Sequence, residues 1–185
     1  MGGVVASMWG LEAVDTVSGH WLDRFGIRPR DLDSLPEVLS APFLHYGWEH
    51  LVSNTVPLFI LGFLVLLTGW RAFATVTILS ILTSGLLVWL IAPPASVTLG
   101  ASGVVFGYLT HVLIRGFFTK KVSHVLIALA VAFFYGSILL GVLPGAAGVS
   151  WQAHLGGAIG GVLAAFLLFR DTSRTSVRRQ RSFLS

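Results

Sequence analysis

Long apolar runs separated by short polar breaks constrain this chain more than any other feature of its sequence. A helix needs about 20 mostly apolar residues to cross the hydrocarbon core of a bilayer. Five runs approach that length, and a weaker sixth run at the N-terminus contains Glu12 and Asp15. The pattern predicts an all-α fold, a polytopic membrane bundle of six transmembrane helices. The expected spans are 2–22, 49–69, 73–92, 100–115, 122–140 and 149–169.

Composition supports this class and excludes several others. Hydrophobic residues make up 55% of the chain and charged residues only 11%, whereas a soluble domain carries about a quarter charged residues. The chain has no cysteine, which excludes disulfides, thiolate metal sites and a cysteine nucleophile. Its basic residues lie between apolar runs and at the C-terminal end, a pattern typical of membrane orientation. We therefore expect the lipid bilayer, and no nucleic acid, as its surroundings.

The distribution of charge also predicts the domain organisation. Residues 1–170 are expected to form one transmembrane domain, with a polar, proline-containing loop at 23–47 between the first two helices. Basic residues follow the second, fourth and sixth runs, and such residues favour the cytoplasmic side. Both termini are therefore predicted to be cytoplasmic in a cell membrane; five spans would separate them. Residues 171–185 are expected to form a basic tail, disordered or lying on anionic lipid.

Four polar side chains share one depth in the predicted bundle. At about 1.5 Å per residue from the basic cytoplasmic ends, Ser102, His154 and Asn54 lie about 20 to 25 Å up, in the outer half of the membrane. His50 is one helical turn above Asn54 on the same face. Polar groups at such depth are costly and indicate a functional site by default. Three predicted helices therefore converge on one layer.

The residue types at this layer fit nucleophilic catalysis. Gly103 and Gly107 are spaced by four, as is a second pair that begins at Gly157, and small residues at this spacing let helix backbones approach closely. A close approach would bring the imidazole of His154 within reach of the Ser102 hydroxyl, as a general base requires.

Donors for an oxyanion hole are present at the same layer. His50 and Asn54 can both donate hydrogen bonds, and the backbone N–H of Ser102 lies near a helix N-terminus, where the helix dipole favours negative charge. The connection at 93–99 must enter the bilayer to reach Ser102, and such backbone is tolerated only where it is buried or lines water.

Three motifs in this order resemble those of the rhomboid family of intramembrane serine proteases, over roughly 44–170. They are Gly100-Ala101-Ser102-Gly103 as the GxSG motif, His50-x-x-x-Asn54, and Ala153-His154-x-x-Gly157. The resemblance implies a serine endopeptidase that needs no cofactor or metal and cuts peptide bonds in or near transmembrane helices of membrane-protein substrates. It implies a catalytic dyad of Ser102 and His154 and an oxyanion hole of His50, Asn54 and Ser102. Supporting residues would be Gly100, Gly103, Phe106 and Gly157, with the ring of Phe106 stacked on His154.

Two features depart from the family pattern. A Trp-Arg pair often found in the long first loop is missing at 40–45, and Phe106 stands where the stacking aromatic can be Tyr. The alternative function is a catalytically silent, rhomboid-like protein that binds membrane clients. Such a protein would be expected to lack the serine or histidine of the dyad, and this chain has both.

Other classes fit less well. A haem or metal protein using His50, His111 or His154 is disfavoured, because His111 lies toward the cytoplasmic end and no carboxylate completes a site at depth. A transporter would be expected to contain an inverted repeat, which the sequence lacks. We interpret His111 as an interfacial residue, and His45 is a candidate for shaping the cavity mouth. The sequence names no substrate and no oligomeric state.

Overall fold

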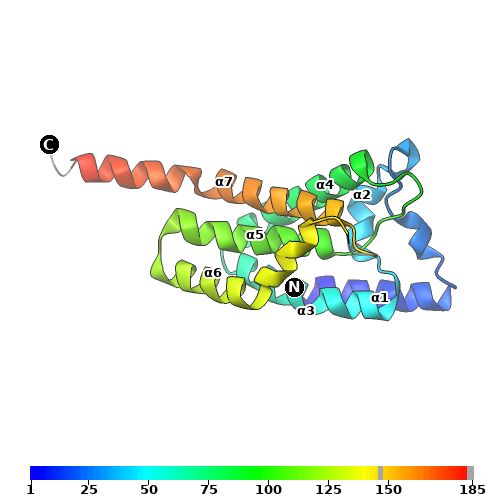
Figure 1. Cartoon of the computed structure of the whole chain (residues 1–185). Helices are drawn as coiled ribbons and strands as arrows, with labels where there is room; N and C mark the ends of the chain where they lie inside the picture. The colour runs from blue at the N-terminus through cyan, green and yellow to red at the C-terminus, as the bar shows by residue number, and fades with distance from the viewer. Residues whose placement is uncertain (146–147, 183–185) are drawn as a thin grey trace.

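The computed structural model describes the backbone of residues 1–145 and 148–182, and the side chains of 1–145 and 148–169. The regular elements in this part of the chain are helices. One isolated antiparallel bridge pairs Ile27 with Thr98. The α-helices (Figure 1) are α1 (Gly2–Val17), α2 (Glu37–Ser40), α3 (Gly47–Leu66), α4 (Trp70–Ile91), α5 (Ser102–Thr119), α6 (Val122–Tyr135) and α7 (Trp151–Ser182). The 3₁₀ segments are η1 (Leu22–Phe25), η2 (Leu32–Ser34), η3 (Ala41–Phe43) and η4 (Gly136–Val142).

Four helical stretches of the described chain are long and apolar enough to cross a membrane, at 47–66, 70–91, 122–142 and 151–169. The all-helical, multi-pass class predicted from the sequence is therefore supported, but six spans are not confirmed. The predicted first and fourth spans correspond to α1 and α5, which have 16 and 18 residues. Helix α1 carries two buried carboxylates, and α5 is packed against α3, α4, α6 and α7. A helix enclosed by other helices need not present an apolar surface to lipid.

Two segments differ from the sequence-based expectations in detail. The predicted loop at 23–47 folds into a compact series of short helices, η1, η2, α2 and η3, none of which is long enough to cross a membrane. Helix α7 does not end near Arg170 but continues to Ser182 and projects beyond the rest of the bundle (Figure 1). The backbone of 171–182 is therefore helical, and the basic tail on 171–185, disordered or lying on anionic lipid, stays a prediction. The basic side chains of this tail lie outside the described residues.

The first loop supports the non-helical connection that leads to α5. The guanidinium of Arg30 donates to the carbonyls of Leu90 and Ala92 at 2.9 Å each, which satisfies exposed acceptors at the end of α4. Ile27 and Thr98 exchange backbone hydrogen bonds of 2.8 and 3.0 Å, and the N–H of Gly100 donates to Ala41 at 2.9 Å. The buried backbone groups before α5 therefore find partners in the loop, as a connection at this depth requires.

Small residues hold α7 against α5, as predicted from their spacing, and also against α4, which was not predicted. A Cβ at Gly157 would overlap the carbonyl of Gly103, so the two backbones touch there. The hydroxyl of Ser84 donates to the carbonyl of Ala153 at 2.9 Å, and that of Thr83 donates to Gly156 at 2.6 Å. These contacts fix the first turns of α7 relative to the N-terminus of α5.

Candidate functional site

Ser102 is the first residue of α5, and the turn before it depends on a glycine. Gly100 has φ = 120°, which L side chains rarely adopt, and a Cβ there would lie 2.6 Å from Cε1 of His50. The first N–H groups of an α-helix have no partner within the helix, so this end of α5 offers donors beside the half-buried serine. The sequence therefore places a hydroxyl and free backbone donors together at one helix N-terminus.

His154 lies in the first turn of α7 and is held by two contacts. The ring of Phe106 stacks on it, with centroids 4.1 Å apart and an angle of 11° between the planes, as the resemblance implied. Nδ1 of His154 lies 2.9 Å from the carbonyl oxygen of Gly141 in η4. Because a carbonyl can only accept, Nδ1 must carry the proton of the neutral ring. Nε2 is then left with a free lone pair, the form a general base needs.

The two residues predicted to form the dyad flank a direct contact between α5 and α7. Ser102 precedes Gly103, and His154 follows Ala153; a Cβ on Gly103 would lie 3.2 Å from the Ala153 carbonyl. Within the described part of the chain, the Ser102 hydroxyl makes no hydrogen bond. Catalytic hydrogen bonds are often long in the absence of substrate and tighten when substrate binds.

His50 and Asn54, the predicted oxyanion donors, behave differently from one another. The N–H of Tyr46 donates to Nδ1 of His50 at 3.3 Å, so the proton of the neutral ring is on Nε2. A Cβ at Gly100 would lie 2.9 Å from this Nε2, which places the donor beside the turn that leads to Ser102. Asn54 is buried and donates to the carbonyl of His50 at 2.9 Å, within its own helix. One amide hydrogen of Asn54 remains for another acceptor.

His45 contributes more to the site than its sequence position indicated. Its side chain is buried, and its Nε2 accepts a hydrogen bond of 3.4 Å from the N–H of Ala101. Its ring meets that of His50 edge to face, with centroids 5.1 Å apart. Burial first, and the nearby His50 second, lower the pKa of His45 to about 4, so the ring stays neutral and can accept. The only sequence signal was a histidine five residues before His50.

His111 corrects one sequence-based interpretation. It was expected at the membrane interface, but its side chain is fully buried, with its ring 5.7 Å from that of Phe169. The interpretation is wrong because the face of α5 that carries His111 packs against the neighbouring helices, although Phe117 on the same helix is exposed. His111 lies nine residues, or about two and a half helical turns, after Ser102, away from the predicted dyad.

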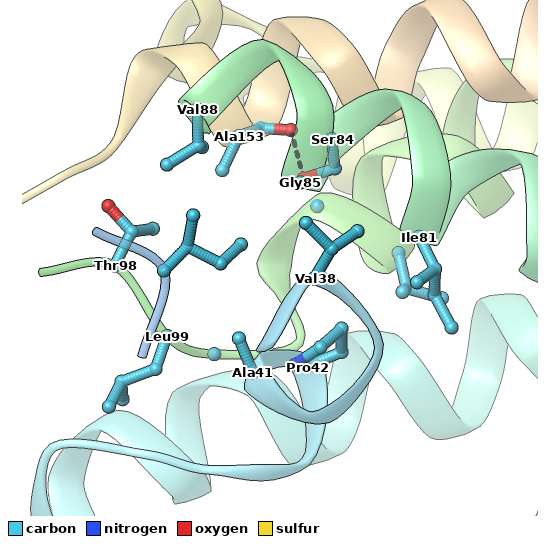
Figure 2. Close-up of a pocket in the computed structure, with 14 residues that line it drawn as sticks. Val38, Ala41, Pro42, Ile81, Ser84, Gly85, Val88, Thr98, Leu99 and Ala153 are labelled. Carbon is cyan, nitrogen blue, oxygen red and sulfur yellow. Dashed lines mark hydrogen bonds between the residues drawn. The ribbon is translucent and has the colours of Figure 1, made fainter. Parts of the chain in front are cut away.

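An apolar pocket lies beside the N-terminus of α5 (Figure 2). Its walls come from the first loop, from α4 and from the segment that leads to α5, and Figure 2 shows the side chains of Val38, Val88 and Thr98 around it. Gly100 and Gly103, on either side of the Ala101–Ser102 pair, also line it. Most of the lining is aliphatic, so the pocket suits a small apolar group next to the serine.

The fold and the site define a class: a multi-pass helical membrane protein with a serine and a histidine at the contact of two helices. A model of the rhomboid domain matches residues 33–171, which is more than half of the chain. The chain belongs to the rhomboid family.

Several curated proteins are similar to this chain, and they include one with a rhomboid name. An uncharacterized protein of Mycobacterium tuberculosis is 45% identical over 172 residues, covering 89% of this chain and 72% of the relative. A second, from Mycobacterium leprae, is 40% identical and covers 95% of this chain and 73% of the relative. Rhomboid-like protease 5 of Toxoplasma gondii is 32% identical over 77% of this chain, but only 17% of that protein is matched.

Proposed function

We propose that this protein is an intramembrane serine endopeptidase that hydrolyses peptide bonds in or near transmembrane helices of other membrane proteins. The observation that carries the proposal is the state of His154. Its Nδ1–H is held by the Gly141 carbonyl and its ring is stacked on Phe106, so Nε2 is the basic atom. A histidine fixed in this tautomer beside a serine at a helix N-terminus is the arrangement that nucleophilic catalysis uses.

The proposed reaction follows from these positions. Nε2 of His154 takes the proton of the Ser102 hydroxyl as Oγ attacks the substrate carbonyl carbon. The negative charge on the carbonyl oxygen is stabilised by the N–H of Ser102, by Nε2–H of His50 and by the free amide hydrogen of Asn54. His154 then gives this proton to the leaving amine as the C–N bond breaks, which leaves an ester on Ser102. In the second half, Nε2 of His154 takes a proton from water as the water attacks the ester carbonyl, and returns it to Oγ of Ser102 as the C–O bond breaks. The Gly141 carbonyl orients the imidazole, as a carboxylate does in a triad.

The substrate class follows from the pocket and the predicted depth of the site. The aliphatic pocket beside Gly100 and Gly103 would take a small apolar side chain of a substrate segment. With both termini cytoplasmic, Ser102 would open toward the outer half of the membrane, where a substrate helix could unwind near small residues. Transmembrane proteins are therefore the proposed partners, within a cell membrane.

Cleavage of a single-span model substrate in liposomes tests the proposal. Wild type should cut it, and Ser102→Ala and His154→Ala should each lower the rate by at least about a thousandfold, because nucleophile and base act as a unit. Ser53→Ala is the matched control: Ser53 is exposed on α3 and donates only to its own helix, to His50 at 2.8 Å. This variant should cut at the wild-type rate.

Covalent labelling separates the nucleophile from the choice of substrate. A fluorophosphonate probe should label wild type and Ser53→Ala at Ser102 and should fail to label Ser102→Ala. His154→Ala should label far more slowly, because its serine lacks the base. If folded wild type is neither labelled nor active, but still binds the model substrate, the client-binding function replaces the protease.

A further inference from the structure

Three potential metal ligands meet where α1 ends and the first loop begins. Donor atoms of Asp15, His20 and Asp23 all lie within 4.8 Å of one another. Metal–ligand bonds of about 2.0 to 2.6 Å allow two ligands of one ion to be at most about 4 to 5 Å apart. The three side chains therefore already have a spacing that one cation can bridge. They come from α1, the turn after it and η1.

The turn after α1 brings these donors together. Gly19 and His20 both have left-handed backbone conformations, with φ of 69° and 62°, and the N–H of His20 donates to the Asp15 carbonyl at 2.9 Å. Nδ1 of His20 lies 3.1 Å from one carboxylate oxygen of Asp15, and the N–H of Leu22 donates to the other at 2.6 Å. The Asp15 carboxylate is thus fixed at the centre of the group, with its side chain 3% exposed.

A fourth carboxylate gives independent evidence for a ligand. Glu12 is 2% exposed, and among the residues that the structure describes its carboxylate oxygens meet no side-chain donor and only a weak contact with the backbone N–H of Gly47. It lies one helical turn before Asp15 and lines the same small pocket as Asp15 and Asp23. An unpaired buried carboxylate is costly, and such groups in proteins are paired or coordinate metals. No side chain of the described residues pairs with Glu12, so a cation would satisfy it.

Asp23, in η1 of the first loop, also has a buried carboxylate oxygen without a partner in the described part of the chain. Its Oδ1 is buried and has no hydrogen-bond partner among the described residues. Two carboxyl groups without a side-chain donor therefore face a third that is already fixed in place.

We propose that Glu12, Asp15, His20 and Asp23 bind one divalent transition-metal cation, of the Mn²⁺ or Zn²⁺ type. Three carboxylates supply hard oxygen donors, and the imidazole favours a transition metal over Ca²⁺ or Mg²⁺. This site is separate from the proposed serine chemistry and does not depend on it. The cation would join the end of α1 to η1.

The position of the cation site gives it a structural consequence. Its pocket is also lined by His45, which accepts the hydrogen bond from Ala101, next to Ser102. The bound ion would therefore brace the part of the first loop that packs against the turn before α5. We expect its main effect to be on the stability of this end of the molecule, which is measurable without any substrate.

Thermal unfolding with and without metal tests the proposal. The whole chain is purified in detergent, treated with a chelator and returned to buffer with Mn²⁺. Because the folded state binds the ion and the unfolded state does not, Tm should rise by about 5 to 10 °C at a hundredfold excess over Kd. Electron paramagnetic resonance should count one bound Mn²⁺ per chain. A larger rise with Ca²⁺ than with Mn²⁺ would contradict a site that includes His20.

Two variants and a matched control locate the ion. Asp23→Asn and Glu12→Gln should each abolish most of the Mn²⁺-dependent rise, while their Tm without metal equals or exceeds that of wild type, because carboxylate repulsion is relieved. Asp33→Asn makes the same chemical change at an exposed carboxylate of the same loop and should keep the full rise. The proposal is overturned if wild type shows no rise, or if both site variants keep it. Should one variant fail to fold, the other decides.

Discussion

Helices α6 and α7 are both long enough to span a membrane, yet they are opposite in character. In the stretch 151–169 of α7, 50% of the residues of its most apolar window are buried within the protein, and the mean hydropathy is 1.6. In the stretch 122–142, which covers α6 and η4, only 6% are buried and the mean hydropathy is 2.5. In lipid there is no hydrophobic force between helices, so close packing depends on small and polar residues. The more apolar helix therefore has the surface that suits lipid, and the glycine-rich helix carries the candidate residue His154.

The two regions meet at the ring of His154. Gly141, in the η4 extension of α6, offers the carbonyl that holds His154, and a Cβ at Gly141 would lie only 2.9 Å from Nδ1 of that ring. The loosely packed region thus contributes one backbone acceptor, while α5 and α7 contribute the side chains. Close packing of α5 and α7 sets the relative position of Ser102 and His154. One carbonyl from η4 is enough to orient the imidazole ring.

Among the substitutions that test the contrast between α6 and α7, Gly157→Leu should lower the free energy of unfolding the most. A Cβ there would overlap the Gly103 carbonyl, so the side chain would force α5 and α7 apart. We expect a loss of more than about 4 kcal/mol in the free energy of unfolding, enough to prevent folding. The free energy of unfolding is measured by circular dichroism while a denaturing detergent is titrated into the protein in mild detergent.

Gly136→Leu is the matched control for Gly157→Leu. A Cβ at Gly136, where η4 begins, has no neighbour within 4 Å, and its φ is not left-handed. The free energy of unfolding should change by less than about 0.5 kcal/mol. If both substitutions changed the free energy of unfolding equally, the closer packing of α7 would contribute no more to stability than that of α6.

The sequence was sufficient for those features of the site that depend on local pattern. Glycine spacing predicted the contact of α5 with α7, and the stacking of Phe106 on His154 followed from the family resemblance. The roles of Ser102 and His154 in catalysis stay predictions. Their common depth in the membrane also stays a prediction, which rests on counting the constant rise per residue from the charged helix ends.

Other features were inaccessible because they depend on contacts between segments far apart in the chain. The carbonyl of Gly141 has no side-chain signature, so nothing in the sequence marked it as the partner of His154. The role of His45 depends on the docking of the first loop on Ala101. The burial of His111 depends on α5 being surrounded by other helices, which a pattern within α5 cannot reveal.

A pair of leucine truncations should give the next largest effect. Leu109 on α5 is 0% exposed and Leu129 on α6 is 62% exposed. Leu109→Ala should lower the free energy of unfolding by about 2 to 5 kcal/mol, because it leaves a cavity between packed helices. Leu129→Ala removes the same atoms from a lipid-facing surface and should cost less than about 0.5 kcal/mol. The same unfolding titration measures both changes in the free energy of unfolding. An equal cost at Leu129 and Leu109 would mean that the exposed face of α6 is buried against protein in detergent.

The smallest effect should come from a hydrogen bond rather than from packing. Ser84 on α4 donates to the carbonyl of Ala153 in the first turns of α7, and Ser53 on α3 donates only within its own helix. Ser84→Ala should cost about 1 kcal/mol, because a buried carbonyl loses a donor, whereas Ser53→Ala should cost almost nothing. If Ser84→Ala proved as harmful as Gly157→Leu, hydrogen bonds would hold α7 in place. A cost near 1 kcal/mol would instead assign that role to the contact of the glycine backbones, with the serine adjusting the register of α7 against α4.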